Sequence, residues 1–116
     1  GPADSYTDRS LYDRCITRGY PGSMMPAIYG NQYEIVQAPG MVAIRYEMIH
    51  ETRIIPIDGR PRLGDGIRLW NGEPRGRWEG NTLVIESTNY NDKGSIATSA
   101  ATGRMASVVR SFSWRR

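Results

Sequence analysis

The sequence has very few of the residues that most often carry catalysis or bind metals. Its 116 residues include a single histidine, His50, and a single cysteine, Cys15. One cysteine cannot form an intrachain disulfide. One histidine and one cysteine also fall short of the three or four ligands of a usual zinc site. No P-loop and no dinucleotide-binding glycine motif occurs. We therefore expect neither a metal nor a cofactor.

Long apolar runs are also lacking. No stretch approaches the roughly 20 apolar residues of a membrane span, and the hydrophobic share of 39% is that of a globular protein. The length predicts a single domain, residues 1–116. Within it we expect residues 1–8 to be flexible and residues 89–104, which are poor in large apolar side chains, to form a mobile loop. The leading Gly1-Pro2 is typical of a protease scar, so any export signal would already have been removed.

The basic residues are almost all arginine, with Lys93 as the exception, and the net charge is +3. This charge is too small and too dispersed to indicate a nucleic-acid partner. The guanidinium fork suits carboxylates and phosphates, although ordinary surface charge explains the bias as well. Only the tail, Arg110 to Arg116, mixes aromatic and basic residues densely. An edge strand protected by charge has the same composition.

The apolar pattern predicts a mainly β protein. Ser10, followed by apolar residues at helical spacing and then Gly19, predicts one short N-terminal helix. From residue 33 the apolar period is two, and the turn sequences Ala38-Pro39-Gly40 and Gly80-Asn81 predict hairpins. We expect strands at 33–37 and 105–114 and a hairpin at 77–86. Between them lies the long strand-like run 41–58, whose second apolar part is 54–57. We expect an antiparallel meander of five or six strands.

His50 lies within the longest strand-like run, Met41 to Asp58. On a regular strand one face carries Val42, Ile44, Tyr46, Met48, His50, Thr52 and Ile54, and the other face carries Arg45, Glu47, Glu51 and Arg53. We expect the first face to be buried. Apolar ends with a semi-polar middle are typical of the wall of a ligand cavity. Ordinary half-buried residues with their polar tips in solvent would give the same pattern, so both interpretations stay open.

A catalytic role for His50 requires a second group that tunes it. The candidates are Tyr46, Glu47, Glu51 and Asp58. Glu47 lies on the opposite face of a regular strand, so it helps only if a bulge or turn near Glu47 to Ile49 reverses the register. We take His50, Tyr46 and Glu47 as candidate catalytic residues, and Met48, His50, Arg53 and Trp78 as candidate ligand-binding residues. We disfavour a Cys15 nucleophile, because this cysteine is expected on the apolar side of its helix.

Several motifs carry a resemblance to a known family. They are Asp13-Arg14-Cys15-Ile16-Thr17-Arg18-Gly19, Pro21-Gly22-Ser23-Met24, Tyr46-Glu47-Met48-Ile49-His50-Glu51-Thr52-Arg53, Asp58-Gly59-Arg60-Pro61 and Gly76-Arg77-Trp78-Glu79-Gly80-Asn81-Thr82-Leu83-Val84. With these the chain is similar to a family of uncharacterised bacterial proteins, often exported. The resemblance implies a small lipocalin-like β-barrel and a periplasmic or secreted location. It transfers no activity.

The chain departs from that family near its end. Family members continue through a strand with a Glu-Arg-Phe-like motif, whereas this sequence reads Arg110-Ser111-Phe112-Ser113-Trp114-Arg115-Arg116. The resemblance therefore implies a short or C-terminally divergent member with an incomplete barrel. Unpaired strands and three tryptophans need burial, which favours a homodimer.

Three functions follow as hypotheses. The first is binding of a small, largely apolar molecule in a half-open barrel whose wall includes Tyr46, Met48 and His50, with Arg53 or Trp78 at the rim. The second is a small lyase, isomerase or hydratase that uses His50 as proton shuttle, oriented by Glu47 or Asp58, with Tyr46 donating to an oxyanion. The third is a structural homo-oligomerisation module that pairs through its charged, aromatic tail.

Overall fold

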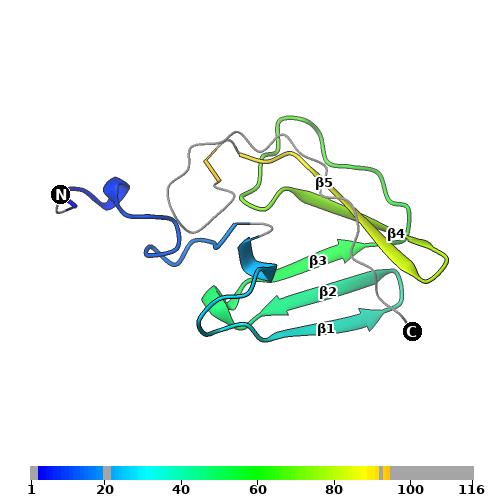
Figure 1. Cartoon of the computed structure of the whole chain (residues 1–116). Coiled ribbons are helices and arrows are strands. Elements are labelled where there is room, and N and C mark those ends of the chain that lie inside the picture. Colours follow the sequence, from blue (N-terminus) through cyan, green and yellow to red (C-terminus); the bar gives the residue numbers. More distant parts are fainter. Residues whose placement is uncertain (1–2, 20–21, 92, 95–116) are drawn as a thin grey trace.

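The computed structural model describes residues 3–19, 22–91 and 93–94 (Figure 1). It contains five antiparallel strands in two sheets, which confirms the mainly β fold. The strands are β1 (Tyr33–Ala38), β2 (Met41–Tyr46), β3 (Thr52–Pro56), β4 (Glu73–Glu79) and β5 (Thr82–Thr88). Within the described residues the sheets do not close into a barrel. The strand expected at 105–114, the tail, Gly1-Pro2 and most of the loop expected at 89–104 lie outside these residues.

The helical segments are short 3-10 turns: η1 (Tyr6–Asp8), η2 (Gly22–Met24) and η3 (Met48–His50). Ser5 caps η1, and its N–H donates to Oδ2 of Asp8 at 2.8 Å. The helix expected from Ser10 closes only one turn, in which the N–H of Arg14 donates to the Ser10 carbonyl at 3.1 Å. Cys15 takes a left-handed φ of 53° there. Its side chain is exposed, so the expectation that it faces the apolar side is wrong.

Both predicted hairpins are confirmed. Ala38 pairs with Met41 across the first turn, where Gly40 has a φ of 77°. Glu79 pairs with Thr82 across the second turn, where Gly80 has a φ of 61°. Glycine adopts these values without the steric penalty that a Cβ brings.

The long run 41–58 is two strands and not one. β2 and β3 are antiparallel neighbours, joined by a connection that contains η3. Ile49 (φ 62°) and His50 (φ 54°) are both left-handed, and this conformation lets the chain reverse within a few residues. The N–H of Tyr46 donates to the Glu51 carbonyl at 2.8 Å and closes the connection.

The connection also reverses which residues face the core. Arg53 and Ile55 point inward, whereas Thr52 and Ile54 point outward and Ile54 is 55% exposed. The expectation that Ile54 is buried and Arg53 lies on the outer face is therefore wrong. A regular strand would have kept the original alternation, because successive side chains point to opposite faces.

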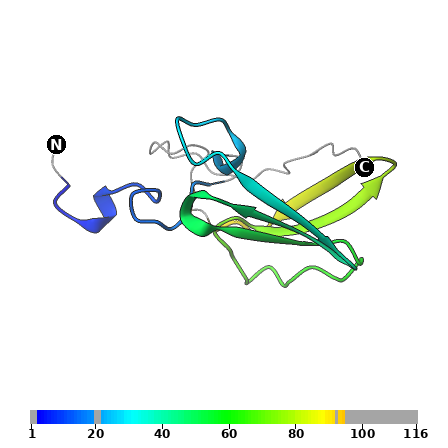
Figure 2. The same cartoon turned by 90° about the horizontal axis from the view of Figure 1, so that it is seen from below.

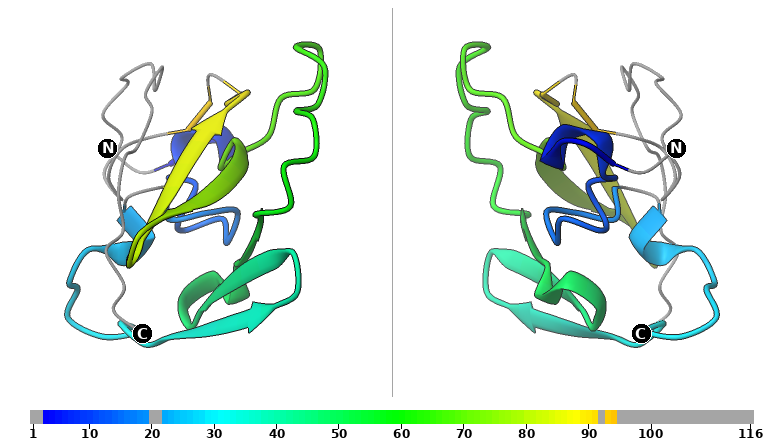
Figure 3. Two further views of the ribbon diagram at one scale, coloured as in Figure 1. Left: turned by 90° about the vertical axis from the view of Figure 1, so that its right-hand side faces the viewer. Right: turned by 90° about the vertical axis from the view of Figure 1, so that its left-hand side faces the viewer.

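The core lies between the three-stranded sheet and the β4–β5 hairpin. Its buried members are Val42, Ile44, Tyr46, Ile55, Leu83 and Ile85. Gly76 lets the two sheets approach, since a Cβ there would lie 2.8 Å from Cγ2 of Ile55 and 2.9 Å from Cγ2 of Ile57. The hairpin lies on the β3 side of the three-stranded sheet (Figures 1 and 3). η1 lies beyond the end of the sheets opposite the two hairpin turns (Figure 2).

Candidate functional site

The connection between β2 and β3 forms one side of a surface pocket of about 380 Å³. The pocket is lined by Gln32, Tyr33, Glu34, Arg45, Tyr46, Glu47 and His50. All three residues predicted as catalytic, Tyr46, Glu47 and His50, are therefore in its wall. Glu47 and His50 reach one pocket because the chain turns between them. A turn at this position was the condition under which the two residues could act together.

The polar contacts of the pocket join the connection to the start of β1. The N–H of Glu47 donates to the Gln32 carbonyl at 2.9 Å, and Oε2 of Glu47 accepts from the N–H of Gln32 at 3.3 Å. Across the pair of strands, the ring centroids of Tyr33 and Tyr46 lie 6.4 Å apart at an angle of 56°. Tyr46 is buried and Tyr33 is half exposed. The pocket thus offers an aromatic wall beside backbone-anchored polar groups.

His50 is exposed, so its predicted place on the buried face is wrong. The left-handed backbone at Ile49 and His50 turns the imidazole outward. Within the described part of the chain, the imidazole takes part in no hydrogen bond or ion pair with Glu47 or any other residue. The carboxylate–imidazole contact that would orient a proton shuttle is not formed.

The other predicted site residues lie outside the pocket wall. Met48 packs against Gly30, where a Cβ would lie 2.5 Å from its Cγ. Arg53 is buried, and its Nη2 donates to Oγ of Ser87 on β5. Trp78 packs against the core.

Asp58, a candidate partner of His50, is placed elsewhere. It lies beside Gly40 in the β1–β2 turn, at the end of β2 away from the pocket. Its carboxylate forms an ion pair with Arg60, and the hydrogen bonds from Arg60 lower the pKa of Asp58 to about 2. This acid cannot orient the imidazole.

Glu51 is the half-buried acid whose importance sequence reasoning missed, having named it only as a partner of His50. Oγ1 of Thr17 donates to its Oε1 at 3.1 Å, and Nδ2 of Asn71 donates to the same oxygen. Oγ of Ser23 donates to Oε2 at 3.5 Å. Burial raises the pKa of Glu51, while the hydrogen bonds from Thr17 and Ser23 and the charge of Arg53 oppose this rise. No short-range pattern identifies partners so far apart in the chain.

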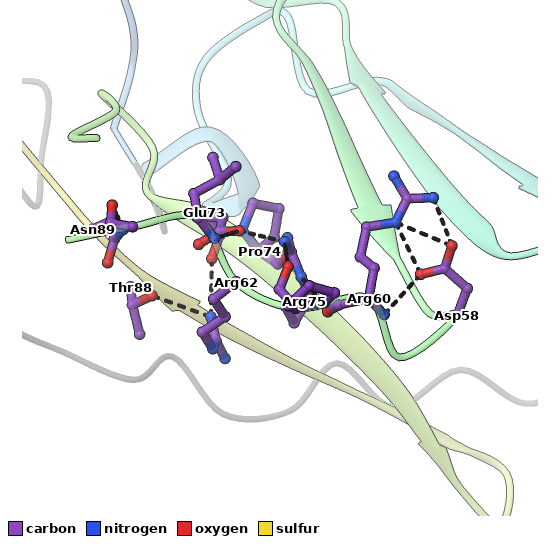
Figure 4. A network of polar contacts seen from close by, with 11 residues as sticks. Asp58, Arg60, Arg62, Glu73, Pro74, Arg75, Thr88 and Asn89 are labelled. Carbon is purple, nitrogen blue, oxygen red and sulfur yellow. Dashed lines mark hydrogen bonds and ion pairs between the residues drawn. The ribbon is translucent and has the colours of Figure 1, made fainter. Parts of the chain in front are cut away.

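A separate charge network holds the loop before β4 against the hairpin (Figure 4). Glu73 is only 2% exposed; it forms an ion pair with Arg75, and its Oε1 accepts from the N–H of Leu63 at 2.8 Å. Nη1 of Arg62 donates to Oγ1 of Thr88 at 3.1 Å. These contacts join the loop to β4 and β5, so we assign them a role in stabilising the fold.

Comparison with known proteins adds no further constraint. No family model, no curated protein and no solved structure matches this chain. The resemblance drawn from the motifs therefore stays a prediction. In the described residues no helix has the length and apolar character needed to span a membrane. Within the same ranges, no three His, Cys, Asp or Glu side chains are grouped as a metal site would require.

Proposed function

We propose that the protein binds a small amphipathic molecule in the pocket between β1, the end of β2 and η3. The observation that supports this proposal is that Tyr46, Glu47 and His50 line one pocket of about 380 Å³. That volume lies within the range of roughly 300 to 1,000 Å³ that is usual for small-molecule sites.

The lining indicates the kind of ligand. The tilted pair of Tyr33 and Tyr46 suits a planar apolar group. Arg45 and Glu34 form a long, exposed ion pair at 3.9 Å, whose weak coupling leaves both groups able to bind a ligand. His50 offers a donor and an acceptor on its imidazole. A planar molecule with one or two polar substituents fits this set better than a purely apolar one.

Thermal unfolding with a library of aromatic acids and amines tests the proposal. We expect selected members to raise the melting temperature of the wild type, and we expect Tyr33→Ala and His50→Asn to reduce that rise. Asparagine is chosen at position 50 because it tolerates a left-handed backbone. Thr52→Ala is the matched control, since Thr52 is exposed and follows the connection without lining the pocket. Ligands that stabilise all four proteins equally would place binding elsewhere.

The enzyme hypothesis is the second candidate, because Glu47 and His50 share the pocket. It requires a bound substrate to draw the imidazole and the carboxylate into contact, since catalytic hydrogen bonds often tighten only in the complex. A ligand found by the screen should then be converted by the wild type and not by His50→Asn. If the ligand is recovered unchanged after prolonged incubation with the wild type, the enzyme hypothesis is contradicted and binding remains the proposed function.

The homo-oligomer hypothesis is favoured by one further observation. Val36, Ala43 and Ile54 pair across β1, β2 and β3 on the outer face of the sheet, and Val36 and Ile54 are about half exposed. An apolar row of this kind suits contact with a second copy. Sedimentation of the wild type and Ile54→Lys tests it: a wild-type dimer that the substitution dissociates supports the hypothesis, and a wild-type monomer removes it.

A further inference from the structure

Arg18 is a buried cation that has no acidic partner among the described residues. Its side chain is only 7% exposed. Nη1 donates to the Gly30 carbonyl at 3.5 Å, and Nε is buried with no acceptor. A guanidinium carries five N–H donors, and the donor on Nε has no acceptor among the described residues. Buried charges are normally paired, because an unpaired one loses its hydration without compensation.

Two other arginines show why Arg18 stands apart. Arg53 is equally buried, but its Nη2 donates to Ser87 and its charge acts on Glu51. Arg68 resembles Arg18 in that it donates to a carbonyl, that of Tyr90 at 3.4 Å. Arg68 is exposed, however, so water completes its hydrogen bonds. Arg18 has neither a side-chain acceptor nor free access to water at its Nε.

The rest of the chain offers few acids that could neutralise Arg18. Residues 95–116 contain no aspartate and no glutamate. Among the printed residues outside the described ranges, Asp92 therefore carries the one acidic side chain.

We propose that Arg18, together with Tyr12 and Tyr29, binds an oxyanion, either a carboxylate or a phosphate group of a small ligand. The guanidinium of Arg18 lies over the Tyr12 ring, 5.5 Å from its centroid. Tyr29 lies close enough to the Tyr12 phenol to affect its pKa. Tyr29 is 65% exposed, so the site opens to solvent on that side. A guanidinium fork beside phenolic O–H donors is chemistry that recognises oxyanions.

Tyr12 keeps its proton in this arrangement. The hydrogen bond with Tyr29 is the main cause that raises the pKa of Tyr12. Tyr12 is therefore a neutral donor at physiological pH, and it adds no negative charge that would repel an anion. None of these three residues lines the pocket of the proposed function, so the two sites can fail independently.

Thermal unfolding of the full chain in phosphate, acetate or chloride at matched ionic strength tests the proposal. At about ten times its dissociation constant, a bound anion should raise the melting temperature by roughly 5 °C. We expect this rise with phosphate, acetate or both, relative to chloride. A rise with phosphate alone assigns the site to phosphate groups, and a rise with acetate assigns it to carboxylates. Arg18→Gln should abolish the rise, and the exposed control Arg68→Gln should retain it. A rise that survives Arg18→Gln overturns the proposal.

A second measurement covers the case in which Arg18→Gln does not fold. In the wild type, the Nε–Hε resonance of Arg18 should shift during titration with inorganic phosphate. This resonance is identified as the one that is missing from the spectrum of Arg18→Lys. A resonance that phosphate leaves in place but that moves in Asp92→Asn overturns the proposal, because the cation then has its partner within the chain.

Discussion

His50 and Glu51 are neighbours in the sequence but face opposite sides of the β2–β3 connection. The imidazole of His50 lines the surface pocket, whereas the carboxylate of Glu51 accepts hydrogen bonds from Thr17 and Asn71 on the inner side. The left-handed backbone at Ile49 and His50 produces this divergence. One short connection therefore builds two different environments, an exposed imidazole and a desolvated acid.

The backbone at His50 predicts how substitutions there affect stability. A β-branched residue at a φ of 54° suffers a steric penalty of about 1 to 2 kcal/mol, whereas asparagine tolerates this conformation. We expect His50→Val to destabilise the protein by about that amount and His50→Asn to change stability by less than ~0.5 kcal/mol. Urea unfolding measures both. Thr52→Val, at an exposed strand position, is the control and should be nearly neutral; equal stability of the two His50 variants would contradict the left-handed geometry.

The reversed register of β3 predicts opposite outcomes at two adjacent isoleucines. Ile55 is 0% exposed and belongs to the core, whereas Ile54 is 55% exposed. We expect Ile55→Ala to lower the free energy of unfolding by about 2 to 5 kcal/mol. Ile54→Ala should cost only ~0.5 kcal/mol. Denaturant unfolding compares them directly, and the reverse ranking would restore the alternation of a regular long strand.

The close packing around Gly76 predicts that even a methyl side chain is not tolerated at this position. A Cβ there would overlap Cγ2 of both Ile55 and Ile57, and overpacking of this kind costs about 1 to 3 kcal/mol. We expect Gly76→Ala to be destabilised by that amount. Gly64→Ala is the matched control, since nothing lies within 4 Å of its added Cβ. If both variants unfold at the same denaturant concentration, the two sheets do not approach through Gly76.

The raised pKa of Glu51 predicts that the stability of the protein falls as the pH rises. Its pKa is raised above the ordinary value of 4.5 by burial, so the folded state holds the proton more tightly than the unfolded state. Its contribution to stability is therefore fully present below pH 4.5 and is lost as the pH rises through the folded pKa. Glu51→Gln cannot titrate. We expect the stability of the wild type, relative to this variant, to fall as the pH rises from 4 to 7.

Asp58 provides an internal contrast to Glu51. Hydrogen bonds from Arg60 lower its pKa to about 2, so its contribution is present above pH 3.8 and is lost as the pH falls toward 2. The stability of the wild type relative to Asp58→Asn should therefore decrease in acid, opposite to the trend for Glu51→Gln. Equilibrium unfolding across this pH range measures both differences, and a shared sign would contradict one of the two assignments.

The two hairpins could be predicted from the sequence because they depend on neighbours in the chain. Alternating apolar residues specify which side of β2 is buried, and Pro39-Gly40 and Gly80-Asn81 supply turn chemistry at fixed positions. The sequence also raised the alternative of a bulge or turn near Glu47 to Ile49. It could not specify how the run from Tyr46 to Thr52 breaks, since left-handed residues such as Ile49 and His50 have no reliable local signature.

By itself the sequence determined the mainly β fold, the two hairpin turns and the candidate trio Tyr46, Glu47 and His50, because each of these depends on spacing along the chain. Only the tertiary structure decided that His50 is exposed and that Arg53 and Glu51 turn inward. The physical reason is that burial depends on residues remote in sequence. Glu51 meets Thr17 and Asn71 across separations of 34 and 20 residues. Arg18 is buried with no acidic partner in the part of the chain that the structure describes, and its local sequence does not reveal this burial.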